Sequence, residues 1–457
     1  MPDIVLATIN AKWIHPSLAL RLLKANLLGM ESRCEILEFA LRQPLAEKTG
    51  PILNARPKIV GLSVSIWNHA ATIELLRALD RLWDLRPVIV LGGPEASFLG
   101  EDAELFRHAD YVIRGEGEIA FRDLCKRLLT TDETPLPKPG PVFIDAAPVE
   151  TSVIARGYRL YTAEDLGRKL SYVEASRGCP FGCEFCLSGA APDRRVREFP
   201  LDQFLEDMDA LIARGARSFK FLDRTFNLDI GRAIRILEFF LERLRPGLCA
   251  HFEMVPSRFP PELRDTLRRF PPGSLRLELG IQTLNPGVAA LIGRPSDPER
   301  EMEILGFLRR ETNAMIHADL IAGLPGEDLR SFARGFDRLW QVRPGEIQVG
   351  ILKLLPGTAL GRHAGPFGMR FNPNPPYEVL ETAALPMADL DRLKNFARFW
   401  ELIVNRGAFN ALVDRLFPPE APVFAPFMEL SGRLLARFGR NWGLDRRDLR
   451  EALSEAG

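Results

Sequence analysis

Apolar and polar positions alternate in two separate blocks of the chain, and each block predicts strands separated by helices. In residues 1 to about 130, short apolar runs indicate buried strands, and stretches with apolar residues three or four positions apart indicate amphipathic helices. Five strands alternating with helices predict a doubly wound parallel sheet of flavodoxin-like order, which binds ligands at the carboxyl ends of its strands. The predicted strands are Ile4–Thr8, Cys34–Glu38, Ile59–Val64, Val88–Leu91 and Tyr111–Ile113; the predicted helices are Ser17–Leu28, His69–Trp83, Glu101–Phe106 and Glu118–Leu129.

The same alternation returns between Lys169 and Pro356. Six strand–helix units predict a partial (β/α)6 barrel that is open on one side, with its catalytic face at the carboxyl ends of the strands. The predicted strands are Leu170–Ala175, Ser218–Leu222, His251–Val255, Leu275–Gly280, Ile316–Ile321 and Ile347–Lys353; among the intervening helices are Leu201–Arg214, Ile230–Arg243 and Glu299–Glu311.

Two segments lack this alternation. Residues 131–168 contain prolines at positions 135, 137, 139, 141 and 148, which favours a semi-rigid linker. Residues 359–457 show only helical patterns after a proline-rich hinge at 371–377 and predict a C-terminal helical cap, a candidate cover for the open side of the barrel. The expected domains are therefore residues 1–130, a linker at 131–168, the barrel at 169–358 and the cap at 359–457.

Composition narrows the class of protein. The 457 residues include 60 Lys+Arg and 60 Asp+Glu, so the balanced charge gives no broad electrostatic footprint for nucleic acid or membrane. The first residues lack the regions of a signal peptide, and the longest uncharged run, Ile59–Ile73, is too short and too polar to cross a bilayer. We expect a cytoplasmic protein in a reducing compartment, with Cys34, Cys125 and Cys249 as separate buried thiols.

Three of the six cysteines lie within eight residues, as Cys179, Cys183 and Cys186, in the spacing C-x3-C-x2-C. Cysteine thiolates are the usual ligands of iron–sulfur clusters, and three ligands leave one iron of a [4Fe–4S] cluster open to a substrate. The glycines and proline of the loop suit a chain that wraps closely around an inorganic core. Zinc is a weaker alternative because no second cysteine pair exists, and three unconnected core thiols are the plainest alternative.

With Phe185 directly before the third cysteine, this loop resembles that of radical S-adenosylmethionine (SAM) enzymes. The resemblance implies that Cys179, Cys183 and Cys186 hold three irons and that SAM chelates the fourth. It also implies reductive cleavage of SAM to methionine and a 5′-deoxyadenosyl radical.

The later strand ends resemble the branch that contains coproporphyrinogen oxidase and the elongator catalytic subunit. Gln282 and Arg294 have that branch's twelve-residue separation for holding the ribose and the methionyl carboxylate, and a planar guanidinium suits a carboxylate. By the same resemblance Asp223 and Glu253 are candidates for contacts with SAM, and Asp319 serves ribose or substrate. The segment Asp319–Glu327 reads D-L-I-A-G-L-P-G-E, as in that branch, although the motif at Asp223 lacks the usual glycines.

Neither G-x-G-x-x-G after the first strand nor G-x-x-x-x-G-K-[ST] occurs, so nucleotide phosphate binding is poorly supported. With Ser63 and Ser65 after the third strand, Gly92-Gly93-Pro94 after the fourth and the turn at Arg114–Glu118, the first domain instead resembles the cobalamin-binding domain that precedes many radical SAM cores. The resemblance places cobalamin at the strand ends, but the D-x-H-x-x-G motif that supplies histidine to cobalt elsewhere is absent. A purely structural Rossmann-like domain is the alternative. The candidate cobalamin residues are Ser63, Ser65, Trp67, Gly92, Gly93, Pro94, Gly115 and Glu116.

These resemblances together predict a cobalamin-dependent radical SAM enzyme that transfers a methyl group to an unactivated carbon or phosphorus. Alternatives are a radical SAM rearrangement, cyclisation or oxidation without methyl transfer, and a non-catalytic iron–sulfur sensor. Methylthiotransferases are disfavoured because only Cys34 and Cys125 lie in the first domain. The expected partners are a flavodoxin- or ferredoxin-type electron donor and a substrate that the sequence does not identify.

Overall fold

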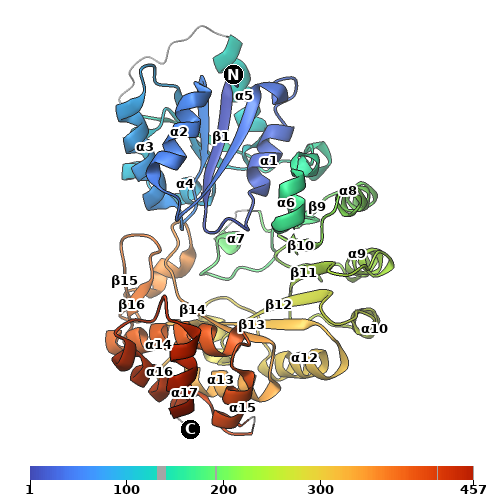
Figure 1. The fold of residues 1–457 in the computed structure, drawn as a ribbon, viewed down its shortest axis with the longest axis vertical. Coiled ribbons are helices and arrows are strands. Elements are labelled where there is room, and N and C mark those ends of the chain that lie inside the picture. Colours follow the sequence, from blue (N-terminus) through green and yellow to red (C-terminus); the bar gives the residue numbers. More distant parts are fainter. Residues whose placement is uncertain (131–139, 191–192, 419, 456–457) are drawn as a thin grey trace. The chain divides into compact units, whose positions relative to one another are not determined.

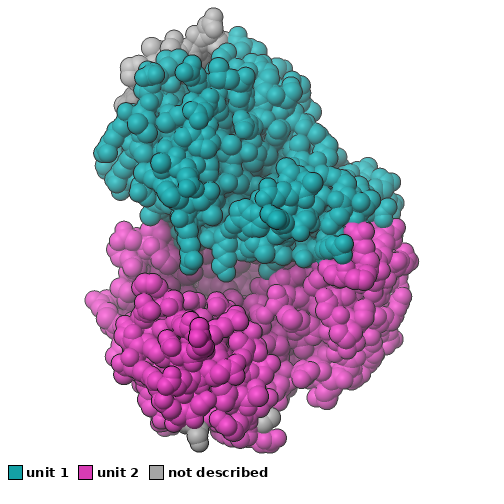
Figure 2. Space-filling view, in the orientation of Figure 1, with its two compact units in different colours: residues 1–176, 197–222 teal, residues 177–196, 223–457 magenta. Residues whose placement is uncertain are grey.

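The computed structural model describes residues 1–130, 140–190, 193–418 and 420–455. These residues form two compact units, one of residues 1–176 with 197–222 and one of residues 177–196 with 223–457 (Figure 2). The first part of the predicted linker, residues 131–139, lies outside the described residues. None of the described helices is both long and apolar enough to cross a bilayer.

A six-stranded parallel sheet forms the centre of the first unit (Figure 1). Its spatial order is β2 (Cys34–Ala40), β1 (Ile4–Asn10), β3 (Ile59–Ser63), β4 (Val88–Gly92), β5 (Tyr111–Gly115) and β6 (Val142–Ala146). The first five strands confirm the predicted flavodoxin-like order. The sixth strand was not predicted, because residues 142–146 were assigned to the linker.

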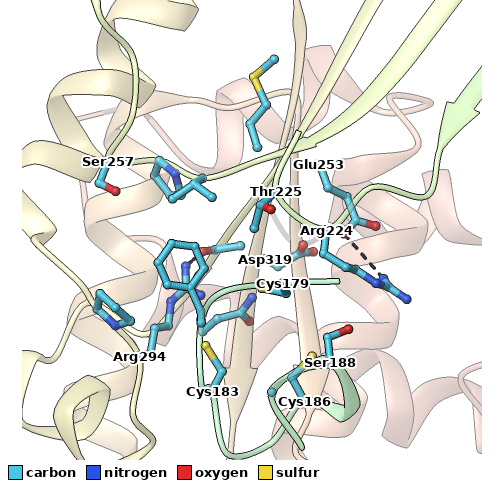
Figure 3. A pocket seen from close by; sticks show the side chains of 18 of the residues that line it. Cys179, Cys183, Cys186, Ser188, Arg224, Thr225, Glu253, Ser257, Arg294 and Asp319 are labelled. Atoms are coloured by element: carbon cyan, nitrogen blue, oxygen red, sulfur yellow. Dashed lines mark hydrogen bonds and ion pairs between the residues drawn. The ribbon is translucent and has the colours of Figure 1, made fainter. Parts of the chain in front are cut away.

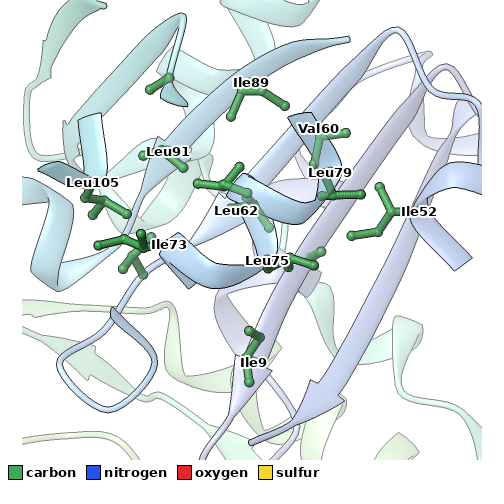
Figure 4. Close-up of a cluster of buried hydrophobic side chains, with 14 of the residues drawn as sticks. Ile9, Ile52, Val60, Leu62, Ile73, Leu75, Leu79, Ile89, Leu91 and Leu105 are labelled. Carbon is green, nitrogen blue, oxygen red and sulfur yellow. The ribbon is translucent and has the colours of Figure 1, made fainter. Parts of the chain in front are cut away.

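Helices cover both faces of this sheet because successive strand residues point to opposite sides. Val5 and Ala7 pack with the face that carries α2 (Leu45–Ala55) and α3 (His69–Leu82), and Figure 4 shows this core. Ile4 and Leu6 pack with the opposite face, covered by α1 (Leu18–Ala25) and α5 (Gly117–Thr130). The short α4 (Pro94–Phe98) and η2 (Glu104–His108) complete the first layer.

Two of the predicted barrel strands belong to the first unit. Strand β7 (Ser171–Val173) pairs in parallel with β10 (Ser218–Phe221), and α8 (Leu201–Ala213) precedes β10. The short elements of this unit are η1 (Glu31–Arg33), η3 (Thr151–Val153), η4 (Gly157–Leu160), α6 (Ala163–Arg168) and β9 (Arg197–Glu198); β8 (Ser176–Arg177) follows β7.

The second unit contains the remaining four barrel strands, which pair in parallel in chain order: β11 (Cys249–Met254), β12 (Leu275–Gln282), β13 (Met315–Ala322) and β14 (Glu346–Ile351). Residues on β11, β12 and β13 alternate between fully and partly buried, so one face of these strands packs on helices and the other carries polar groups. The helices are α7 (Leu187–Ala190), α9 (Ile230–Glu242), α10 (Pro261–Arg268), α11 (Pro286–Leu291), α12 (Pro298–Glu311) and α13 (Leu329–Val342). The predicted α/β fold class is confirmed.

The C-terminal helices pack on α13 through aromatic side chains. The ring of Phe336 on α13 lies 4.7 Å from that of Trp400 and 5.8 Å from that of Phe424, in edge-on arrangements. The elements of this region are η5 (Ala359–His363), β15 (Arg370–Phe371), β16 (Val379–Glu381), α14 (Met387–Trp400), the π-helical turn η6 (Glu401–Asn405), α15 (Asn410–Leu416), α16 (Phe424–Phe438) and α17 (Arg446–Glu455).

The side chain of Asn405 forms hydrogen bonds with both backbone groups of Ile347 on β14. Its side-chain amide accepts from the backbone N–H of Ile347 at 3.2 Å and donates to the carbonyl of Ile347 at 3.1 Å. One side chain therefore replaces a neighbouring strand at this position.

Candidate active site

The three cysteines line a single pocket of about 290 Å³ in the second unit (Figure 3). Cys183 is buried, and Cys179 and Cys186 are half-buried. The aromatic side chain predicted to accompany them, Phe185, lines the same pocket. The loop thus presents its thiols to one shared space.

Burial raises the pKa of the Cys183 thiol, while the charge of the Arg294 guanidinium and a hydrogen bond from it act in the opposite direction. Burial likewise raises the pKa of Cys179, and Arg224 opposes this more weakly. Metal coordination deprotonates a thiol outright, so bound iron rather than the protein would supply most of the stabilisation of these thiolates.

The end of β12 has an irregular backbone where it meets the pocket. The register with β13 shifts between Gly280 and Gln282, and Gln282 has φ +68°, a left-handed conformation that is uncommon for residues other than glycine. Gly280 leaves room for two side chains, because a Cβ there would lie 2.5 Å from Gln282 Nε2 and 3.9 Å from Arg294. The bulge therefore turns Gln282 into the pocket.

Arg294 is held beside Gln282 by a hydrogen bond from its guanidinium to the Gly280 carbonyl. Its Nε is buried and lacks a hydrogen-bond partner among the described residues. An unsatisfied buried donor is costly, so this atom marks a position for a ligand acceptor. A carboxylate would satisfy it.

Two further predicted residues, Glu253 and Asp319, also line the pocket. Glu253 lies 3.6 Å from Arg224 at ion-pair distance, as Figure 3 shows, and Asp319 Oδ1 lies 3.1 Å from His317 Nε2. Asp223 is 2% exposed and does not line the pocket, whereas Arg224 and Thr225 do. The structure therefore brings Glu253, Gln282, Arg294 and Asp319 together with the cysteines, but not the side chain of Asp223.

His251 and His317 have carboxylate partners on the polar face of the strands. His251 Nε2 lies 3.0 Å from Glu278 on the next strand, and His317 Nδ1 lies 3.5 Å from Glu346. Burial lowers the pKa of His317, but Asp319 and its carboxylate neighbours outweigh this and raise it overall. In the described ranges no group of three or more His, Cys, Asp or Glu converges on a single metal ion.

Glu301 on α12 is a pocket residue that the sequence analysis missed. It is 2% exposed, and its Oε2 has no hydrogen-bond partner in the part of the chain that the structure describes. Burial raises the pKa of this carboxyl group to about 7, although the nearby Arg294 charge lowers it. No sequence signal marks it, because its burial depends on how α12 packs.

The predicted cobalamin residues lie at the carboxyl ends of β3, β4 and β5 in the first unit. Ser65 is buried and its N–H donates to Asn68 at 2.8 Å, whereas Trp67 is 52% exposed. Gly93 has φ +99°, and a Cβ there would lie 2.6 Å from the Val64 carbonyl, so the fold itself requires this glycine. A Cβ on Gly92 would meet its nearest neighbour at 3.6 Å, an ordinary contact. Packing within the protein therefore does not explain why residue 92 is a glycine.

Protein partners occupy the other predicted residues at this edge. The Glu116 carboxylate pairs with Arg197 and accepts from the Val149 N–H at 2.8 Å. Gly115 has φ +87°, and a Cβ there would lie 2.5 Å from the Ala146 carbonyl on β6. Pro94 occupies the first position of α4. These contacts give Gly115 and Glu116 structural roles beside the cofactor role that the sequence predicts.

The strand ends of the first unit and the pocket of the second unit lie in segments that match two different domain families. Residues 4–125 match the B12 binding domain, and residues 173–339 match the radical SAM superfamily. Residues 365–434 match a family of unknown function, DUF4080. The chain thus contains a match to the B12 binding domain and a separate match to the radical SAM superfamily, which confirms the predicted recognition.

More specific relatives are distant. An uncharacterised methyltransferase of Pyrococcus horikoshii is 25% identical over 297 residues, 60% of this chain and 62% of that protein. The cobalamin-dependent radical SAM methyltransferase TokK of Streptomyces tokunonensis is 24% identical, over 66% of this chain and 48% of that protein. The matches span less than two thirds of either relative.

A solved structure shares the fold over the whole chain. The cobalamin-dependent SAM radical enzyme OxsB, with aqua-cobalamin and SAM bound, superimposes with a TM-score of 0.63. The match covers 100% of this chain and 79% of that one at 15% identity, a level that supports the fold alone.

Proposed function

We propose that the protein is a cobalamin-dependent radical SAM methyltransferase. The observation that carries the proposal is the convergence of Cys179, Cys183 and Cys186 with Gln282 and Arg294 around one pocket. Two buried polar atoms of pocket residues, Arg294 Nε and Glu301 Oε2, have no hydrogen-bond partner among the described residues. They fit a ligand that bears both an acceptor and a donor group. The methionyl end of SAM is such a ligand.

The chain's own residues have separable tasks in this proposal. The three thiolates hold a [4Fe–4S] cluster, which supplies the electron for reductive cleavage of SAM when bound. Arg294 binds the methionyl carboxylate through its planar guanidinium. Gln282 and Asp319 orient the ribose, and Glu253 accepts from the methionyl ammonium.

In the first unit, Trp67 and Gly92 support corrinoid binding. Trp67 offers an exposed indole ring at the end of β3, and Gly92 leaves a ligand access to the end of β4. Cobalamin would carry the methyl group to be transferred. We propose that a flavodoxin- or ferredoxin-type protein provides the electrons.

Cofactor stoichiometry tests the proposal first. The protein is purified anaerobically from cells supplied with cobalamin, and iron, sulfide and corrinoid are quantified per chain. About four irons and one corrinoid are expected, as one cubane cluster and one cobalamin require. Four irons without corrinoid would contradict methyl transfer through cobalt, and the absence of a cluster would contradict radical SAM chemistry.

Labelled SAM then separates methyl transfer from the other radical reactions. Incubation with dithionite and SAM that carries a trideuterated methyl group should give methionine and 5′-deoxyadenosine. A fraction of cell extract that contains substrate should gain the labelled methyl group. Cleavage of SAM with a product of changed mass but no label would favour a rearrangement or an oxidation. No cleavage at all would leave a non-catalytic iron–sulfur protein.

A further inference from the structure

Glu184 lies between the second and third cysteines, yet it does not line the pocket. Its side chain is 9% exposed, and Oε2 lies 2.8 Å from Nε2 of His363, a buried residue at the end of η5. Oε1 accepts from the exposed Arg362. Both oxygens of a buried carboxylate are thus engaged by one segment.

The backbone of Glu184 binds two segments as well. Its N–H donates to the Ile292 carbonyl at 3.0 Å, and its carbonyl accepts from the Leu360 N–H at 3.1 Å. Gly293, which follows Ile292 in the chain, packs closely on the cysteine loop, because a Cβ there would lie 3.0 Å from the Gly182 carbonyl. Since Arg294 follows directly, Glu184 connects the cysteine loop, the start of the Arg294 segment and η5.

The hydrogen bonds of Glu184 do not by themselves require a charged side chain at this position. A buried carboxylate costs free energy unless it is paired and hydrogen-bonded, and an amide could make similar contacts at lower cost. The potential of an iron–sulfur cluster depends on nearby net charge, on hydrogen bonds and on solvent exposure. A carboxylate one residue from a cluster ligand opposes the arrival of an electron and so makes the reduced cluster a stronger reductant.

We infer that Glu184 and His363 are positioning residues that set the reduction potential of the cluster and fix its open iron relative to Arg294. The inference rests on the proposed function, because it requires a cluster in the cysteine loop. His363 acts through Glu184: it keeps the carboxylate buried and directed away from the pocket. Arg362 contributes little, because its side chain is 65% exposed and its charge is screened by solvent.

The test compares Glu184→Gln, His363→Ala and His363→Gln with Arg362→Ala as the matched control. Each protein is reconstituted anaerobically, its iron and sulfide are counted, and the reduced cluster is followed by potentiometric titration and electron paramagnetic resonance with and without SAM. Glu184→Gln should hold its cluster at a more positive potential and cleave SAM at least tenfold more slowly. His363→Ala should alter the resonance observed with SAM. His363→Gln should give the same resonance with SAM as the parent, because the amide nitrogen of glutamine reaches the position that Nε2 of His363 occupies. Arg362→Ala should stay within twofold of the parent rate.

The outcomes separate this inference from the proposed function. Variants with full iron content whose potential and resonance equal those of the parent would overturn the inference and leave the proposed function intact. If Glu184→Gln fails to fold, the two His363 variants decide, since equal spectra for both and for the parent would also overturn it. A parent protein that binds no cluster would overturn both.

Discussion

The strand ends of the two units carry unusual backbone conformations for different reasons. In the first unit, Gly93 and Gly115 have positive φ, and neighbouring carbonyls lie where their Cβ atoms would be. In the second unit, Gln282 has positive φ although it carries a side chain, and that side chain lies beside Arg294 in the pocket. Backbone strain of this kind persists where surrounding structure enforces it, often at functional sites. The first set of residues therefore reports on the fold, and we propose that the conformation of Gln282 reports on a ligand.

The largest effect should come from Cys183→Ala. Removal of one of three protein ligands should abolish the cluster and hence reductive cleavage of SAM, measured as 5′-deoxyadenosine formed with dithionite. The control is Cys249→Ala, which removes a half-buried thiol outside the pocket. Turnover retained in Cys183→Ala would refute the assignment of this cysteine.

Gly93→Ala should be the most damaging change to the first unit. The new Cβ would lie 2.6 Å from the Val64 carbonyl at positive φ, so we expect a loss of about 2–4 kcal/mol of unfolding free energy. Gly92→Ala meets no such neighbour and should change stability by less than about 1 kcal/mol. If corrinoid approaches Gly92, that variant should lose bound corrinoid while its melting temperature is preserved. Unchanged corrinoid content would remove Gly92 from the proposed corrinoid site.

Glu301→Gln should stabilise the ligand-free protein at high pH. Burial raises the pKa of the Glu301 carboxyl group from its ordinary value of 4.5 to about 7, so the folded state binds more protons and its stability falls as pH rises from about 4.5 to 7. Gln cannot ionise, and at pH 8 the variant should gain on the order of 2–3 kcal/mol, a gain that disappears below about pH 4.5.

Glu303→Gln on the same helix is the control for Glu301. Arg264 and Arg300 lower the pKa of this exposed carboxyl group, so its removal should give no such stabilisation. Thermal unfolding across pH checks both variants. A Glu301→Gln protein whose melting temperature follows the parent at pH 8 would show that the Glu301 carboxylate is already compensated.

Gln282→Gly should have a small effect on stability and a clear effect on the binding of SAM. Glycine adopts positive φ without strain, so the variant should gain about 1 kcal/mol while its affinity for SAM falls at least tenfold. Arg56→Gly, at the C-cap of α2 with φ +45°, should give a similar gain without any effect on SAM. Calorimetry of SAM binding to the reconstituted proteins distinguishes the two, and equal affinities would remove Gln282 from the site.

The sequence predicted the order of the first five strands, all six strands of the second block and the shared pocket of Cys183, Gln282 and Arg294. Apolar runs and cysteine spacing are local properties of the chain, so they can be read directly. Strand β6 was missed because Val142–Ala146 is short and follows a run of prolines. Helix α2 was missed because Pro51 lies within it.

The remaining site residues depend on tertiary packing. Glu301 and the Glu184–His363 pair have no spacing that a motif could reveal, since their partners are brought together only when α12 and η5 dock. Gly92 and Gly93 were predicted as cobalamin residues, and the position of the Val64 carbonyl shows that the fold itself requires glycine at position 93. Whether a residue serves a ligand or the fold is decided by neighbours distant in sequence.

The amide of Asn405 has a practical consequence for experiments that shorten the chain. A protein ending near residue 358 would keep the barrel strands but lose the side chain that occupies both backbone groups of Ile347. Its outermost strand would then offer unpaired groups to any extended chain, including another copy of itself. Such truncations should precipitate or form oligomers even when the cysteine loop is intact, so the minimal expressible form of this protein includes the π-helical turn.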